Sequence, residues 1–145
     1  MADVVDVATR SKMMAGIRGK DTKPEIFLRK ALHRLGFRYR LGGRGLLGKP
    51  DIVFPALNTV IFVHGCFWHC HHCKYFKWPS TNQLFWENKL TANAARDKRT
   101  KKELEKLGWH VLIVWECELR QTGFKLPNPV VSRVAKQLRA RAEAY

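Results

Sequence analysis

Residues 51–73 read DIVFPALNTVIFVHGCFWHCHHC and decide most of the expected fold. Two runs rich in β-branched residues, 51–54 and 59–63, enclose a short turn at 55–58, and this pattern predicts an antiparallel β-hairpin. The second run leads directly into the segment 64–73, which holds three cysteines and four histidines. The hairpin is therefore expected to carry a cluster of metal-ligating side chains at its end.

The remainder of the chain alternates between helical and strand patterns. Helices are expected over residues 9–20, 22–36, 82–107 and 130–143, and further strands over 37–41 and 109–115. Thr22 is placed to be the N-cap of the second helix, with Glu25 at the capping-box position. Trp109 and Trp115 lie in the apolar last strand and are expected in the core. The order predicts one mixed α/β domain, residues 1–145, with a central sheet flanked by helices.

The chain is strongly basic, with 27 lysines and arginines against 12 acidic residues and a net charge of +15. Residues 1–50 hold twelve basic and four acidic residues, residues 96–145 hold twelve and six, and residues 51–95 hold only three and two. Such a surplus favours a polyanionic partner, usually nucleic acid. We expect both ends of the chain to bind phosphates while the middle makes more specific contacts. A ribosome-associated protein is the less specific alternative.

No part of the sequence indicates export or a membrane span. The first twenty residues contain no apolar stretch long enough for a secretory signal, and no segment approaches the roughly 18–20 apolar residues of a membrane span. We therefore expect a soluble, cytoplasmic, nucleoid-associated monomer. In that compartment four cysteines indicate metal binding or catalysis before disulfides.

The cysteines and histidines have spacings that favour zinc. Cys66, His71 and Cys73 are close enough in sequence to share one ion, and Cys117 follows a buried strand that a neighbouring strand could bring alongside them. Four protein ligands close a tetrahedral site and leave no open position for water, so such a zinc ion is structural. A site of four cysteines, in which Cys70 replaces the histidine, is the alternative.

Asp51 follows Pro50 at the start of a buried strand. A carboxylate at a sheet edge is a suitable ligand for Mg²⁺, which prefers oxygen. In restriction-endonuclease-like folds such an aspartate is followed by an acid and a lysine on the next strand, and residues 60–64 contain neither. On this pattern alone, a solvated carboxylate is the favoured interpretation.

The string HGCFWHCHHC, residues 64–73, resembles the motif of the very short patch repair endonucleases, and similar motifs recur in the family's order over nearly the whole chain. These are MADV (1–4), ATRSKMM (8–14), Glu25, GKPDIVF (48–54), Phe85-Trp86, Arg96-Asp97 and GWHVLIVWEC (108–117). The resemblance implies a restriction-endonuclease-like fold with an added structural zinc. It also implies Mg²⁺-dependent nicking of duplex DNA on the 5′ side of the thymine in a T:G mismatch. Such mismatches arise by deamination of 5-methylcytosine, and the nick starts very short patch repair.

The resemblance also implies roles for the catalytic residues. Asp51 and the backbone carbonyl of Val63 match ligands of the catalytic Mg²⁺, and His69 matches the general acid/base. Three further residues match those that orient the site and hold the waters of the metal ions: Glu25, His64 and Asp97. Simpler interpretations remain open, because Glu25 could only complete the capping box, Asp97 could be a solvated charge, and His64 could support the zinc ligands.

The same resemblance implies one zinc site and a set of contacts to DNA. The implied zinc ligands are Cys66, His71, Cys73 and Cys117. Phe67, Trp68 and Trp86 match aromatic residues that wedge into the major groove beside the mismatch. Met14 belongs to an N-terminal helical arm, residues 1–20, that is expected in the minor groove. Besides mismatched duplex DNA, the expected partners are a mismatch-repair matchmaker protein and, downstream, a DNA polymerase.

Three other functions compete with this expectation. A non-enzymatic zinc-stabilised DNA-binding protein would keep the basic ends but has no need of Asp51 with His69. A mismatch glycosylase would leave an abasic site rather than a strand break. A restriction endonuclease would cut fully paired sites.

Overall fold

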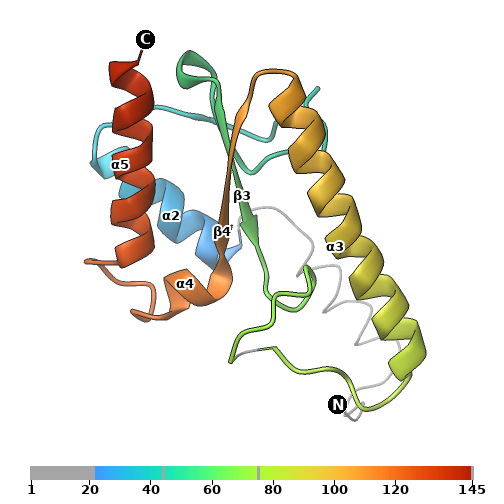
Figure 1. The fold of residues 1–145 in the computed structure, drawn as a ribbon. Coiled ribbons are helices and arrows are strands. Elements are labelled where there is room, and N and C mark those ends of the chain that lie inside the picture. The colour runs from blue at the N-terminus through green and yellow to red at the C-terminus, as the bar shows by residue number, and fades with distance from the viewer. Residues whose placement is uncertain (1–21, 44, 75, 145) are drawn as a thin grey trace.

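The computed structural model describes residues 22–43, 45–74 and 76–144. Within these residues a four-stranded sheet in the order β1-β2-β3-β4 lies between helices on both faces (Figure 1). The strands are β1 (Arg40–Leu41), β2 (Ile52–Phe54), β3 (Thr59–His64) and β4 (His110–Trp115). The helices are α2 (Lys23–Arg34), α3 (Gln83–Lys106), α4 (Glu116–Arg120) and α5 (Pro129–Glu143). The predicted mixed α/β class, with a central sheet flanked by helices, is confirmed.

The predicted hairpin is the antiparallel pair β2–β3, in which Ile52 lies opposite Ile61. Its turn is a short 3-10 helix, Pro55–Leu57. The strand predicted over 37–41 is shorter in the structure, and only β1 pairs regularly with β2. The cause is the end of β2 at Phe54, because the chain turns away there and leaves residues 37 and 38 without a partner strand.

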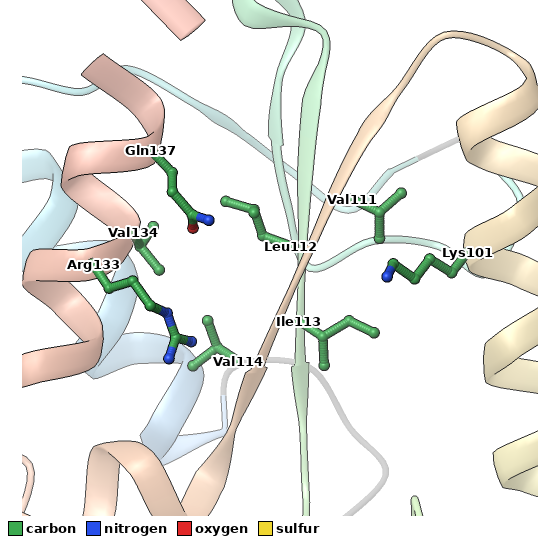
Figure 2. A pocket seen from close by; sticks show the side chains of 8 residues that line it. All are labelled: Lys101, Val111, Leu112, Ile113, Val114, Arg133, Val134 and Gln137. Atoms are coloured by element: carbon green, nitrogen blue, oxygen red, sulfur yellow. The ribbon is translucent and has the colours of Figure 1, made fainter. Parts of the chain in front are cut away.

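Strands β3 and β4 are parallel, from Thr59 opposite His110 to His64 opposite Trp115. Sequence pattern alone does not distinguish parallel from antiparallel pairing of these strands. In the structure α3 makes the crossover between them. The side chains of β4 alternate: those of residues 111 and 113 point toward α3, and those of 112 and 114 toward α5 (Figure 2). Because the pair is parallel, the carboxyl ends of β3 and β4 meet at one edge of the sheet.

Apolar clusters cover both faces of the sheet. On one face the buried side chains come from α2, α4, α5 and the strands, and they include Leu28, Leu32, Ile61, Val114 and Leu138. On the other face Leu104 of α3 packs with four residues of the strands, namely Val53, Val60, Phe62 and Val111. Each fully buried aliphatic side chain stabilises the fold by about 1.5–3 kcal/mol. Two packed faces therefore hold β3 and β4 rigidly, and with them the ends of both strands.

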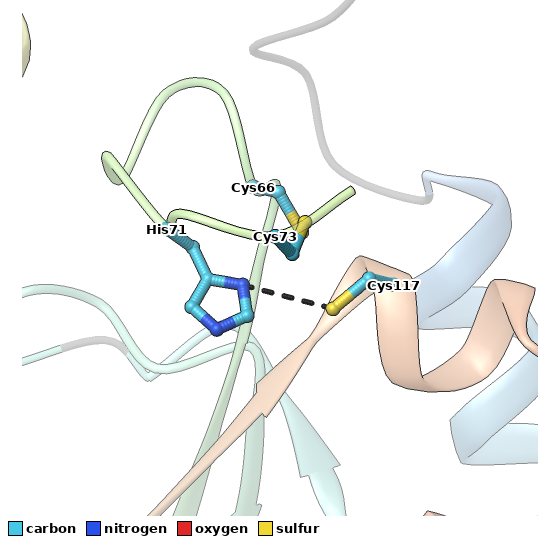
Figure 3. Close-up of side chains that lie close together, drawn as sticks. All are labelled: Cys66, His71, Cys73 and Cys117. Carbon is cyan, nitrogen blue, oxygen red and sulfur yellow. Dashed lines mark hydrogen bonds between the residues drawn. The ribbon is translucent and has the colours of Figure 1, made fainter. Parts of the chain in front are cut away.

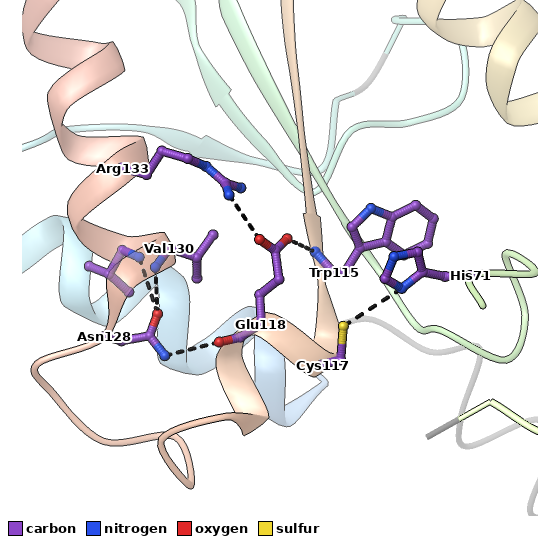
Figure 4. Close-up of polar contacts among 8 residues, drawn as sticks. His71, Trp115, Cys117, Glu118, Asn128, Val130 and Arg133 are labelled. Carbon is purple, nitrogen blue, oxygen red and sulfur yellow. Dashed lines mark hydrogen bonds and ion pairs between the residues drawn. The ribbon is translucent and has the colours of Figure 1, made fainter. Parts of the chain in front are cut away.

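The helix ends follow local sequence signals in two cases and not in a third. Thr22 caps α2 as predicted, since its Oγ1 accepts a hydrogen bond from the Glu25 N–H at 3.4 Å. Asn128 caps α5 in the same way (Figure 4). Helix α4 was not predicted, because five residues are too few to show helical periodicity. Its Glu118 accepts a hydrogen bond from the backbone N–H of Trp115 at 3.0 Å, which starts the helix directly at the end of β4.

No helix among the described residues is long and apolar enough to cross a membrane. The predicted helix at 9–20, with Met14, lies outside those residues.

Candidate active site and metal centre

Both candidate sites lie at the carboxyl ends of β3 and β4. His64 and Trp115 are register partners at these ends. Two residues later come Cys66, in the loop after β3, and Cys117, in the first turn of α4. The parallel register therefore brings together two cysteines that are far apart in sequence.

All four zinc ligands implied by the resemblance converge at this edge (Figure 3). One ligand atom from each of Cys66, His71, Cys73 and Cys117 lies within 4.8 Å of the others. Cys117 Sγ is 3.6 Å from His71 Nδ1, and the His71 N–H donates to the Cys66 carbonyl at 2.9 Å, which tightens the loop. Three sulfurs and one imidazole nitrogen at this spacing are the donor set that a structural zinc ion takes.

Cys70 is not part of this group. Its Sγ lies 3.5 Å from His72 Nε2 on the exposed side of the loop. Its backbone has a positive φ of 54°, which turns the chain between the ligands Cys66 and His71. The structure therefore supports the set with His71 over the alternative of four cysteines.

The thiols are poorly solvated where they meet. Burial raises the pKa of Cys66 to about 12, and burial also raises the pKa of Cys117. Protonated thiols crowded in this way bind no cation, whereas a divalent ion would stabilise the thiolates and release their protons. The donor set thus fits zinc.

Trp115 was expected in the core, and this prediction was wrong. The ring is only partly buried and stacks on His71 with centroids 4.0 Å apart (Figure 4). It also meets His64 edge-on at 5.2 Å. Trp115 therefore lies between the metal cluster and His64, and its stacking holds the orientation of the His71 ring. Trp109 packs against the cluster on the α3 face, as expected.

The second group joins His64, His69 and Asp97. The two imidazole rings are stacked, with centroids 3.7 Å apart and an interplanar angle of 2°. His69 Nδ1 lies 2.5 Å from Asp97 Oδ2. Asp97 is therefore not merely a solvated charge on α3, and His64 contacts His69 directly. Parallel stacked rings direct their in-plane lone pairs side by side, so this set suits proton transfer better than chelation of one ion.

His64 is held in its neutral form. It is 6% exposed, and burial, followed by repulsion from His69, lowers its pKa to about 3. Its Nδ1 is buried without a hydrogen-bond partner in the described part of the chain. A neutral, rigidly packed imidazole orients its neighbour without competing for protons.

Asp51 lies on the β2 side of the same edge. Its Oδ2 accepts a hydrogen bond from the Val63 N–H at 2.7 Å. Burial raises its pKa to about 6, the Val63 hydrogen bond lowers it, and the nearby charge of Glu25 raises it further. Glu25 is itself 6% exposed and forms an ion pair with Arg29 at 3.3 Å. Two poorly solvated carboxyl groups within electrostatic reach of each other fit a divalent cation.

The raised pKa of Asp51 predicts a pH-dependent stability. A carboxyl group whose pKa is higher when folded stabilises the protein fully below about pH 3.8 and loses that contribution as the pH rises through about 6. Asp51→Asn removes the titration and keeps an acceptor for Val63. In zinc-loaded protein without magnesium, Tm of the variant minus Tm of the wild type should therefore increase from about pH 4 to about pH 7. Thermal melts across this range test it, and a pH-independent difference contradicts it.

An aromatic group borders these sites. The rings of Phe67 and Trp68 are partly buried and meet at 5.2 Å, while Trp86 is 8% exposed and lies 5.5 Å from Phe67. The roles of these rings on DNA stay predictions, and Trp86 supports the other two in this conformation. Asn93 was missed: its Nδ2 donates to the Trp68 carbonyl at 3.1 Å. Its helical spacing from Trp86 and Asp97 could have placed it on the same face of α3.

Comparison with known proteins identifies the family. The sequence model described as DNA mismatch endonuclease Vsr matches residues 2–75. The DNA mismatch endonuclease Vsr of Escherichia coli K12 is 50% identical over 120 residues, which cover 83% of this chain and 77% of that protein. The chain belongs to the DNA mismatch endonuclease Vsr family.

Two further relatives of this Vsr family member are named as nicking enzymes. A type II nicking enzyme of Neisseria meningitidis serogroup A is 47% identical over 120 residues, covering 83% of this chain and 86% of that protein. A type II nicking enzyme of Xanthomonas oryzae is 44% identical over 123 residues, covering 85% and 90%. The relatives match this Vsr chain over most of both lengths.

Proposed function

We propose that this chain nicks duplex DNA on the 5′ side of the thymine in a T:G mismatch, by a magnesium-dependent hydrolysis that starts very short patch repair. Membership of the Vsr family makes it a nuclease that acts on DNA. The observation that carries the finer proposal is one arrangement at the end of β3. Asp51 lies within electrostatic reach of Glu25 and of His69, and His69 contacts Asp97.

Asp51 and the backbone carbonyl of Val63 are the proposed magnesium ligands. Glu25 is proposed to hold waters bound to the metal. Magnesium, when bound, neutralises charge on the phosphate and makes a water more acidic. The chain's contribution is a partly buried carboxylate whose orientation is fixed by the Val63 N–H. We also assign a restriction-endonuclease-like fold in a single domain, residues 1–145, in which His69 replaces the usual lysine.

His69 is the proposed general acid/base. Asp97 accepts a hydrogen bond from Nδ1–H, which leaves Nε2 to give or take a proton at the scissile phosphate. The stacked ring of His64 prevents His69 from rotating out of this orientation. Histidine suits the role because its unperturbed pKa lies near neutrality.

Asp97→Asn tests this pairing. An amide can still contact Nδ1 but offers no negative charge to balance an imidazolium, so the single-turnover nicking rate should fall by about 10²-fold. The fall should be larger at the pH values at which the reaction requires protonated His69. The pH–rate profile of the variant should therefore differ from that of the wild type. Glu87→Gln, an exposed change near the start of α3, is the matched control. A rate and profile equal to wild type would remove Asp97 from the site.

The zinc cluster and the aromatic residues are proposed to shape the DNA-binding surface. A zinc ion held by Cys66, His71, Cys73 and Cys117 would fix the loop that carries Phe67 and Trp68. Those rings, with Trp86 behind them, would enter the base stack next to the mismatch, and Met14 would contact the minor groove. Unstacking a base step costs a few kcal/mol, and a mismatch lowers that cost.

Substrate choice is tested with end-labelled duplexes that differ in one base pair. With magnesium present, a T:G duplex in a library of randomised flanks should be nicked at least about 10²-fold faster than the matching T:A duplex. The ends should be a 3′-hydroxyl and a 5′-phosphate on the thymine strand alone. Equal cutting of the T:A duplex would indicate a restriction endonuclease, and an alkali-labile abasic site would indicate a glycosylase.

A further inference from the structure

The outer edge of β4 has no part in the proposed chemistry. Among the described residues β4 has a neighbouring strand on one side only. A groove of about 250 Å³ runs along the other side (Figure 2). Lys101 of α3 forms one wall, and Arg133 and Gln137 of α5 form the other.

Hydrogen bonds at the two ends of β4 show which backbone groups face this groove. The His110 N–H donates to the Asn58 carbonyl at 2.7 Å, on the side of β3. The Trp115 N–H donates to Glu118 Oε1 at 3.0 Å, away from β3 (Figure 4). Backbone groups of successive residues in a strand point to alternate sides. The odd-numbered residues of β4 therefore direct their N–H and C=O groups away from β3.

Val111 and Ile113 thus offer two donors and two acceptors to the groove. In the part of the chain that the structure describes, no hydrogen bond occupies these outward groups. Poorly solvated backbone groups gain most from a partner. An added extended strand supplies donors and acceptors at the matching spacing, which is the mode called β-strand addition.

The walls of the groove select the charge of the added strand. Lys101 has no carboxylate partner in the described ranges, and the side chain of Arg133 is 50% exposed although it contacts Glu118 at 2.9 Å. A second copy of this chain, with net charge +15, would bring the same positive walls face to face. Nucleic acid phosphates accept hydrogen bonds but give none to the outward carbonyls. An acidic peptide offers carboxylates to Lys101 and Arg133, and its backbone offers both donors and acceptors to Val111 and Ile113.

We propose that the β4 edge binds an extended acidic segment of a partner protein as an additional strand. The backbone of Val111 and Ile113 pairs with it, and Lys101 and Arg133 bind its carboxylates. This binding does not depend on the chemistry at Asp51. A groove whose basic residues only protect the edge from aggregation would bind no such peptide.

The test uses a fluorescein-labelled seven-residue peptide in which glutamate alternates with valine and threonine, titrated into the full chain. Saturable binding is expected by anisotropy, with amide hydrogen exchange slowed at Val111 and Ile113 by about tenfold or more. Lys101→Glu combined with Arg133→Glu should weaken binding by about tenfold or more. The double variant also loses the contact of Arg133 with Glu118 and with it a support of α4. Lys101→Glu alone keeps that contact and should also weaken binding.

Two controls separate strand addition from charge attraction. Lys102→Glu, an exposed change on α3 outside the groove, should leave Kd within about twofold. A peptide N-methylated at alternate residues keeps its charge and should bind about tenfold more weakly. Equal binding of the methylated peptide, or unchanged exchange at Ile113, overturns the proposal. Protection of Ile113 by self-association without peptide overturns it too, because the edge would then belong to a second copy.

Discussion

Asp51→Asn is expected to lower the single-turnover nicking rate on a T:G duplex by about 10³-fold or more, because divalent-cation catalysis is worth several kcal/mol and each 1.36 kcal/mol is tenfold in rate. Asparagine keeps the shape and the acceptor for the Val63 N–H. It removes the charge that would bind the cation. Rates are measured at saturating enzyme with magnesium, on an end-labelled strand.

Binding separates this loss from misfolding. The variant should bind the T:G duplex within a few-fold of wild type in a mobility-shift assay, because phosphate contacts dominate affinity. Glu143→Gln, an exposed carboxyl at the end of α5, serves as the matched control and should nick at the wild-type rate. A variant at position 51 that nicks normally would remove the carboxylate from the mechanism, whatever its affinity.

Cys117→Ser is expected to release the zinc ion and to lower Tm by at least about 10 °C. Structural zinc contributes folding free energy directly, and one kcal/mol shifts Tm of a domain of this size by several degrees. The loss should be large because Cys117 is the ligand on α4, whereas the other three ligands lie in the loop 64–73. Bound zinc is measured by elemental analysis and stability by calorimetry.

Cys70 provides the matched control for this change. Its thiol lies in the same loop but outside the cluster, next to His72. Cys70→Ser should keep one equivalent of zinc per chain and should change Tm by no more than about 2 °C. Zinc loss in Cys70→Ser together with retention in Cys117→Ser would assign the site to a different ligand set.

The parts of the fold that follow from local pattern were predictable. Runs of β-branched residues gave the hairpin and β4, and Thr22 marked the start of α2. Pairing partners and short elements were not predictable in this way. The parallel alignment of β4 with β3 depends on packing against both faces, α4 is too short to show a period, and β1 is limited by the end of β2.

The candidate sites also combine features that a local pattern predicts with features that only the tertiary structure determines. Crowding of cysteine and histidine in one loop indicated a metal, and its fourth ligand, Cys117, becomes close through the register of β3 with β4. The pairing of His69 with Asp97 spans 28 positions, and only the packing of α3 on the loop determines it. No local pattern places Trp115 against His71, because an apolar strand residue normally packs in the core.

The position of the catalytic ion is the most direct test of the account. A crystal structure of the chain with a T:G duplex and magnesium should show an ion about 2.1 Å from an oxygen of Asp51, next to the phosphate on the 5′ side of the mismatched thymine. A well-ordered complex in which this carboxyl group contacts neither an ion nor the DNA, with the scissile phosphate elsewhere, would contradict it.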